Sequence, residues 1–173
     1  MMHNSVQNLI NIKKLIENSL NNLKVDKKPK IIAVSKTFGI DKIMPLIEFG
    51  HSDFGENKVQ EAFDKWSSLK SNNQKIRLHL IGSLQSNKVK FAVKLFDYIH
   101  SVDSEKLAKK IADEQLKINK KIKIFLQVNI GDENQKSGIN KNEINSLVSY
   151  CKEINLNLIG LMCIPPANVD PEN

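Results

Sequence analysis

Lys36 is the residue whose type and position give the strongest sign of chemistry in this sequence. It ends the segment IIAVSK, residues 31 to 36, which is the most strand-like stretch of the chain. An ammonium group that lies among Ile32, Val34 and other core side chains loses hydration, which favours its neutral and nucleophilic form. The alternative is a structural lysine that reaches out to solvent or pairs with Glu56. Position alone leaves both interpretations open.

Further polar side chains follow the other expected strands where those strands end. They are Glu56 and Asn57 after the second strand, Ser83, Gln85, Ser86 and Asn87 after the third, Asp103 after the fourth, and residues 129 to 136 after the fifth. Folds with parallel strands bind ligands at the carboxyl ends of the strands. Such polar groups are costly to desolvate unless they bind one another or a ligand. A Schiff base between Lys36 and a carbonyl compound or pyridoxal phosphate suits this edge of the sheet.

Three other residues are candidates for contact with a bound ring. His79 lies on the third expected strand and could hydrogen-bond a ring, although a satisfied core histidine is the more frequent case. Asn57 could donate to a phenolate or accept from a neighbouring side chain, or it could cap the helix that follows. Met162 is more typical of a core position than of a ligand contact.

Metal and disulfide chemistry are not expected. The four histidines are scattered without ligand spacing, and Cys151 and Cys163 form no CxxC motif. We expect both cysteines to be buried, reduced thiols.

Composition and charge indicate a soluble globular protein. Hydrophobic residues make up 40% and charged residues 26%, and the longest apolar run, around residues 158 to 164, is too short to span a bilayer. We see no signal peptide, so a cytoplasmic location without membrane partners is expected. The net charge is +7, but every basic residue except Arg77 is lysine. Because base readout favours arginine, a lysine-rich nucleic-acid or anion binder is only a second alternative.

Apolar patterns of helical and strand period alternate along the whole chain. Strands are expected at residues 31–36, 52–55, 77–82, 98–102, 123–130 and 158–164, with helices at 6–23, 41–50, 59–69, 86–96, 104–119 and 144–154. Asp41 is expected to cap the second helix, with Pro45 in its first turn and Gly50 at its end. Asn140 with Glu143 resembles a capping box before the last helix.

This alternation predicts an α/β fold whose parallel strands are joined by right-handed crossovers. A doubly wound sheet would suit six strands, but SKTFG replaces the glycine-rich dinucleotide turn after the first strand. A β/α barrel of the TIM type normally has eight strands and about 250 residues. The pattern alone does not decide between them.

Six stretches, in order along the chain, resemble the pyridoxal-phosphate homeostasis family. They are AVSK at 33–36, FGEN at 54–57, HLIGSLQSNK at 79–88, SVD at 101–103, QVNIGDENQKSG at 127–138 and GLMCIP at 160–165. The resemblance implies a fold-type III, alanine-racemase-like β/α barrel that holds pyridoxal 5′-phosphate (PLP) as a Schiff base. Lys36 matches the family's Schiff-base lysine, and Asn57, His79 and Met162 are the other residues expected at the cofactor.

The resemblance further implies a PLP-binding protein of intracellular vitamin B6 homeostasis rather than an established catalyst. PLP-accepting apoenzymes are its expected partners, and nucleic acid is not. A fold-type III PLP enzyme such as an amino-acid racemase is the alternative, but it would need a second acid/base group facing the ring, which no motif supplies.

The chain departs from the family at its end. The family continues into two more strands that carry the phosphate site, whereas this sequence stops at ANVDPEN. Residues 1–173 are therefore expected to form a single barrel domain, with an N-terminal helix and the first six of eight strands, truncated at its C-terminal end. We expect a monomer if the protein is full-length and association if it is truncated.

Overall fold

Six parallel strands lie side by side in the order in which they occur along the chain. The computed structural model describes residues 2–131 and 137–165. The strands are β1 (Ala33–Val34), β2 (Asp53–Glu56), β3 (Arg77–Leu80), β4 (Tyr98–Val102), β5 (Lys123–Val128) and β6 (Asn157–Cys163). A doubly wound sheet would reverse its strand order at a switch point, and this sheet does not. The order therefore decides the question that the sequence pattern left open, in favour of a partial barrel.

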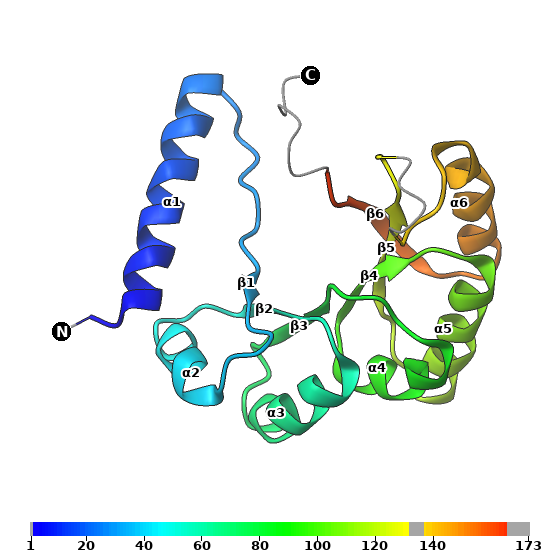
Figure 1. Ribbon diagram of the computed structural model, residues 1–173, viewed down its shortest axis with the longest axis horizontal. Coiled ribbons are helices and arrows are strands. Elements are labelled where there is room, and N and C mark those ends of the chain that lie inside the picture. Colours follow the sequence, from blue (N-terminus) through cyan, green and yellow to red (C-terminus); the bar gives the residue numbers. More distant parts are fainter. Residues whose placement is uncertain (1, 132–136, 166–173) are drawn as a thin grey trace.

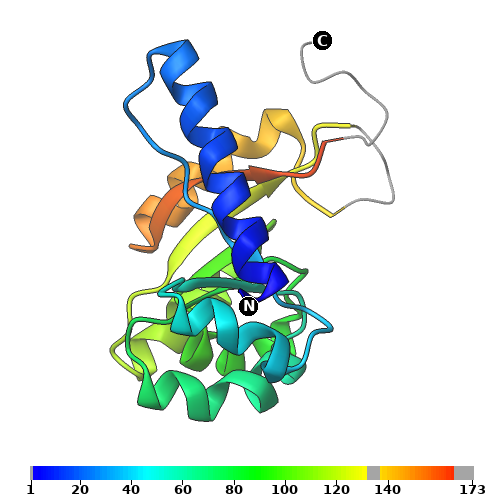
Figure 2. The same cartoon turned by 90° about the vertical axis from the view of Figure 1, so that its left-hand side faces the viewer.

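The helices after the first one follow the outer side of the curved sheet (Figure 1). They are α2 (Ile40–Glu48), α3 (Val59–Asn72), α4 (Val89–Leu95), α5 (Glu105–Lys117) and α6 (Ile144–Glu153), and short 3-10 turns, η1 (Ser86–Lys88) and η2 (Lys141–Glu143), precede α4 and α6. The first helix is α1 (Asn4–Leu23). Figures 1 and 2 show α1 apart from the row formed by α2 to α6. Within the described residues, no helix is long and apolar enough to cross a bilayer.

The hydrophobic core lies between the sheet and these outer helices. Alternate strand residues point to opposite faces, so Phe54 of β2 meets Trp66 of α3, with ring centroids 4.9 Å apart. Both side chains are fully buried. The opposite face of the strands lines the barrel interior, where Gly55 lies beside Ile32 and Ile81. Chemistry at the barrel interior is thus separated from the core that holds the fold together.

Sequence patterns and capping residues predicted most of the helices and strands correctly, but some of the predicted ends were wrong. The capping box of Asn140 and Glu143 is present, and Gly50 follows α2 with a φ of 92°. The N-cap of α2 is Gly39 rather than Asp41, so Pro45 lies inside the helix and not in its first turn. β1 pairs over two residues instead of the expected six, because only β2 lies beside it in the described sheet.

The last strand exposes apolar side chains along one edge of the sheet. Ile159 is 44% and Leu161 53% exposed, although Leu161 is in register with the fully buried Leu126 of β5. Within the described residues, β6 pairs with β5 alone. An edge strand with exposed apolar residues is a template for pairing with another chain.

A polypeptide of these 173 residues should therefore associate through β6. We expect light scattering to detect dimers or larger species. Their population should fall at least severalfold in Leu161→Lys, since a charged side chain on an edge strand opposes pairing with another chain. The matched control is Leu116→Lys on α5, where the leucine is 76% exposed but lies away from the sheet edge. Equal association in both variants would locate the contact elsewhere.

Candidate functional site

Lys36 lies in a turn directly after β1 and is exposed. The expected burial of its amine among core side chains is wrong in the described structure, because Val34 is itself 47% exposed where β1 forms the edge of the sheet. The predicted position at the carboxyl end of the first strand is confirmed. Its role as the Schiff-base residue stays a prediction.

Glu56, the suggested structural partner of Lys36, is bound by other side chains. Its Oε1 accepts hydrogen bonds from Ser35 Oγ at 2.7 Å, Trp66 Nε1 at 2.9 Å and Lys65 Nζ at 3.0 Å. Glu56 is completely buried and Lys65 is 10% exposed. This network joins the residue after β1 to β2 and α3, next to the turn that carries Lys36. No sequence pattern predicted it.

Asn57 follows β2 at the same edge. Its Oδ1 is buried and, among the described residues, has no hydrogen-bond partner. The alternative that Asn57 caps the next helix is wrong, because the N-cap of α3 is Lys58. Gly82 holds the backbone against Asn57: a Cβ on Gly82 would lie 2.3 Å from the Asn57 carbonyl oxygen. Only a glycine allows this approach, so the loop after β3 packs directly on Asn57.

His79 points into the barrel interior, as expected, but both of its ring nitrogens are engaged by protein groups. Nε2 lies 3.1 Å from Asp53 Oδ1, and Nδ1 lies 2.9 Å from His100 Nε2. The ring stacks on Tyr98 at 4.1 Å between centroids, and His100 stacks on Phe125 at 4.3 Å. His79 is 2% exposed. It matches the satisfied core histidine, and its predicted hydrogen bond to a bound ring would require one of these contacts to break.

Burial of this interior cluster favours the neutral form of both imidazoles. Burial, and then the neighbouring His79, lower the pKa of His100 to about 4. Burial also lowers the pKa of His79, although Asp53 opposes the shift. Burial alone would raise the pKa of Asp53, but hydrogen bonds from Arg77, His79 and Ser52 outweigh it and lower the pKa to about 2.

A small cavity opens at the carboxyl ends of β3, β5 and β6. Its volume is about 220 Å³, and its walls are formed by Ile81, Gly82, Ser83, Gln127, Val128, Asn129, Ser137 and Ile164. Gln127 Nε2 donates to the Ser137 carbonyl oxygen at 2.9 Å, and Ser83 Oγ lies 3.3 Å from Ser137 Oγ. Residues 132–136 of the expected polar segment lie outside the described residues.

Met162 lies on β6 in register with Gln127, a wall residue of this cavity, and is half-buried rather than part of the hydrophobic core. Sequence reasoning missed Gln127, because it lies inside a strand and not in the loop after it. Its position two residues after Phe125 was the only available signal, since alternate strand residues share a face.

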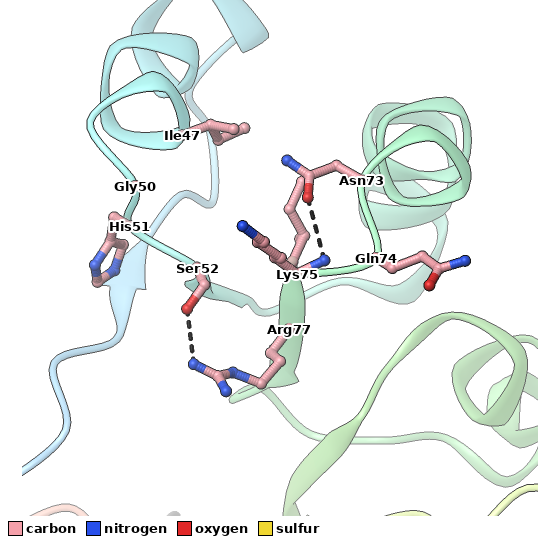
Figure 3. A pocket seen from close by; sticks show the side chains of 9 residues that line it. Ile47, Gly50, His51, Ser52, Asn73, Gln74, Lys75 and Arg77 are labelled. Atoms are coloured by element: carbon pink, nitrogen blue, oxygen red, sulfur yellow. Dashed lines mark hydrogen bonds between the residues drawn. The ribbon is translucent and has the colours of Figure 1, made fainter.

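A second cavity lies at the opposite end of the barrel, where the strands begin (Figure 3). Its volume is about 370 Å³, and its walls include Ile47, His51, Lys75 and Arg77. Arg77 Nη2 donates to Ser52 Oγ at 2.7 Å. This end of a β/α barrel normally serves stability, and its walls include none of the predicted site residues.

The two cysteines differ in their exposure. Cys151 is buried and free, as expected, and burial raises the pKa of its thiol to about 11. Cys163 is free but exposed, contrary to expectation, because it lies on the uncovered strand β6. Among residues 2–131 and 137–165, no group of three or more potential ligands could hold a metal ion.

Comparisons with known proteins agree with this arrangement. The family described as "Alanine racemase, N-terminal domain" matches residues 10–173. The chain is 35% identical over 166 residues to the pyridoxal phosphate homeostasis protein of Pasteurella multocida, covering 95% of this chain and 71% of that protein. It is 41% identical over 169 residues to the protein of that name from Buchnera aphidicola, covering 95% and 72% respectively.

A solved structure of a relative contains the cofactor. PipY of Synechococcus elongatus with PLP bound superposes with a TM-score of 0.74 at 32% identity, covering 89% of this chain and 72% of PipY. The chain thus spans about 70% of the length of the relatives that it matches.

Proposed function

The chain belongs to the pyridoxal phosphate homeostasis protein family, and we propose on this premise that it binds PLP through the amine of Lys36. It takes part in PLP homeostasis, the role for which its relatives are named. The observation that carries the assignment is the accessible amine at the carboxyl end of β1, on the edge where parallel barrels bind ligands.

The residues at this edge fit the cofactor. Asn57 Oδ1 is a buried acceptor without a donor among the described residues, and such a group is costly unless a ligand completes it. A hydroxyl group or a protonated nitrogen on a bound ring would supply that donor. Gly82 allows the neighbouring loop to approach the Asn57 backbone, which fixes this side chain beside the β2 end. A lysine, an amide oxygen without a partner among the described residues, and a cavity with both apolar and polar walls suit an aromatic aldehyde with polar substituents.

PLP supplies an electrophilic aldehyde carbon when it is bound. Lys36 would hold the group at that carbon through its amine, and the exchange would need no oxidant or reductant. Because Lys36 is exposed, a ligand reaches it without any opening of the fold. Asn57 would orient the ring and Met162 would line the site, while His79, held by Asp53 and Tyr98, would support it from the barrel interior.

A cofactor-binding role is favoured over amino-acid racemisation. The relatives are named as homeostasis proteins and not as racemases. A racemase needs two acid/base groups on opposite faces of the ring, and His79 has both nitrogens bound within the barrel. Delivery of PLP to acceptor apoenzymes and a cytoplasmic location are parts of the same proposal.

Reduction of the protein–PLP mixture with borohydride tests the assignment. We expect a pyridoxyl group on the peptide containing residue 36, and a loss of at least tenfold in total labelling in Lys36→Ala. Lys90→Ala is the matched control, because Lys90 is also exposed but lies on α4. Peptide mapping and intact mass measure the adduct. Labelling that persists undiminished in Lys36→Ala, or that maps to another lysine, would refute the role of Lys36.

A further inference from the structure

The turn that carries Lys36 contains a strained residue. Thr37 has a φ of 65°, in the left-handed region that β-branched residues avoid because Cβ approaches the carbonyl oxygen. The turn is closed by a hydrogen bond from the Phe38 N–H to the Ser35 carbonyl oxygen at 3.2 Å. In such a turn, glycine or asparagine is the usual residue at the third position. Strain of this kind persists only where surrounding contacts hold it, and it is concentrated at functional sites.

Two side chains of α3 bind the backbone on either side of Lys36. Glu61 Oε1 accepts a hydrogen bond from the Thr37 N–H at 2.9 Å. Lys65 Nζ donates to the Ser35 carbonyl oxygen at 2.9 Å. The two side chains are themselves paired at 3.7 Å, one helical turn apart. Residues 35 and 37 are therefore both tied to one rigid helix.

We propose that Glu61 and Lys65 are positioning residues that hold the strained turn and so aim Lys36 at the cofactor. This inference rests on the proposed function of Lys36. Fixing the backbone immediately before and after Lys36 fixes the direction of its Cα–Cβ bond. The amine then has fewer accessible orientations, and a larger fraction of them place it near the aldehyde carbon. Lys65 is anchored in turn by the buried Glu56, which links the turn to the core.

The rate of covalent attachment at saturating PLP is the decisive measurement. Glu61→Ala removes the acceptor for Thr37, and we expect the rate constant to fall about tenfold or more, the size expected for one hydrogen bond to a charged group. Glu61→Gln keeps an oxygen acceptor and should stay within about threefold of the unaltered protein. Asp64→Ala, on the exposed side of α3, is the matched control and should change nothing.

A double-mutant cycle separates positioning from simple support of the helix. Glycine adopts positive φ without a side-chain penalty, so Thr37→Gly should make the turn less dependent on Glu61. We expect Glu61→Ala to slow attachment by less than about threefold in the Thr37→Gly background. A Glu61 that merely stabilised α3 would have the same effect whichever residue stands at position 37. The side chain of Glu61 is 33% exposed, so these variants are expected to fold, and unfolding curves check that they do.

The outcomes distinguish the two proposals. Absence of labelling at Lys36 in the unaltered protein would refute the proposed function itself. Labelling of Lys36 at equal rates in Glu61→Ala, Glu61→Gln and the unaltered protein would overturn the positioning role and leave the proposed function standing. A loss on Glu61→Ala that is equally large with and without Thr37→Gly would likewise overturn it, because the strained turn would then play no part.

Discussion

Acidification from pH 6.5 to pH 4 should lower the free energy of unfolding of this protein by about 3 kcal/mol, because of His100. Its pKa falls from 6.5 to about 4 on folding, first through burial and then through the nearby His79. Over this window the unfolded chain takes up a proton that the folded chain does not. The stability is fully present above pH 6.5 and is lost as the pH falls towards the folded pKa.

Urea unfolding at a series of pH values measures this loss, with the fluorescence of the single, buried Trp66 as the probe. His100→Gln keeps an amide beside His79 and removes one titrating ring, so the part of the fall between pH 6.5 and 4 that His100 causes should disappear, while the part from His79, whose pKa burial also lowers, should remain. A second fall, from about pH 3.8 to 2, should remain, because Asp53 has a pKa lowered to about 2 by Arg77 and His79 despite its burial. An unchanged profile in His100→Gln would show that His100 does not cause the first fall.

Glu56→Ala should destabilise the protein by about 3 to 5 kcal/mol, the usual cost of removing one partner of a buried ion pair. Glu56 is completely buried, and its removal takes the acceptor from the Trp66 N–H, the closest acceptor from the Ser35 hydroxyl and the nearest carboxylate from Lys65. Lys65 keeps only the Ser35 carbonyl oxygen and the more distant Glu61 at 3.7 Å. The largest part of this cost is the Lys65 ammonium, whose side chain is 10% exposed and which loses its nearest carboxylate. Chemical denaturation at pH 7 gives the difference directly.

Two variants test whether the charge is the cause. Glu56→Gln retains an oxygen acceptor and should lose only about 1 to 3 kcal/mol. Adding Lys65→Met to Glu56→Ala removes the ammonium that has lost its nearest carboxylate, so the double variant should be more stable than Glu56→Ala alone. A double variant that is less stable than both single variants would contradict this account and would indicate that packing, not charge, dominates at this position.

Sequence reasoning was most successful where the signal is local. Alternating helical and strand periods predicted six strands and the helices between them, and the pair Asn140 and Glu143 predicted a capping box that the structure contains. Burial of one face of an element sets a period in the sequence, and a cap is satisfied within about four residues. The ends of elements were less certain, as β1 and the start of α2 illustrate.

Some features of the candidate site could be predicted from neighbouring residues in the sequence, and others depend on residues far apart in the chain. The position of Lys36 after the first strand could be predicted, because a strand end is visible in the apolar pattern of residues 31–36. Its exposure could not be predicted, since it depends on which strands lie beside β1. The binding of Thr37 by Glu61 was equally hidden, because the two residues are 24 positions apart and no pattern connects them.

By itself, the sequence determined that this is an α/β protein with alternating elements, and that Lys36 and Asn57 follow its first two strands. The family resemblance implied the first six strands of a barrel, which the strand order confirms, whereas only the tertiary structure decided that His79 is held by Asp53 and His100. The physical reason is the distance along the chain between the residues that interact. Hydrophobic periods and caps are satisfied by near neighbours in the chain, whereas the partners of a buried charge or ring are chosen by strand register, which joins residues far apart in sequence.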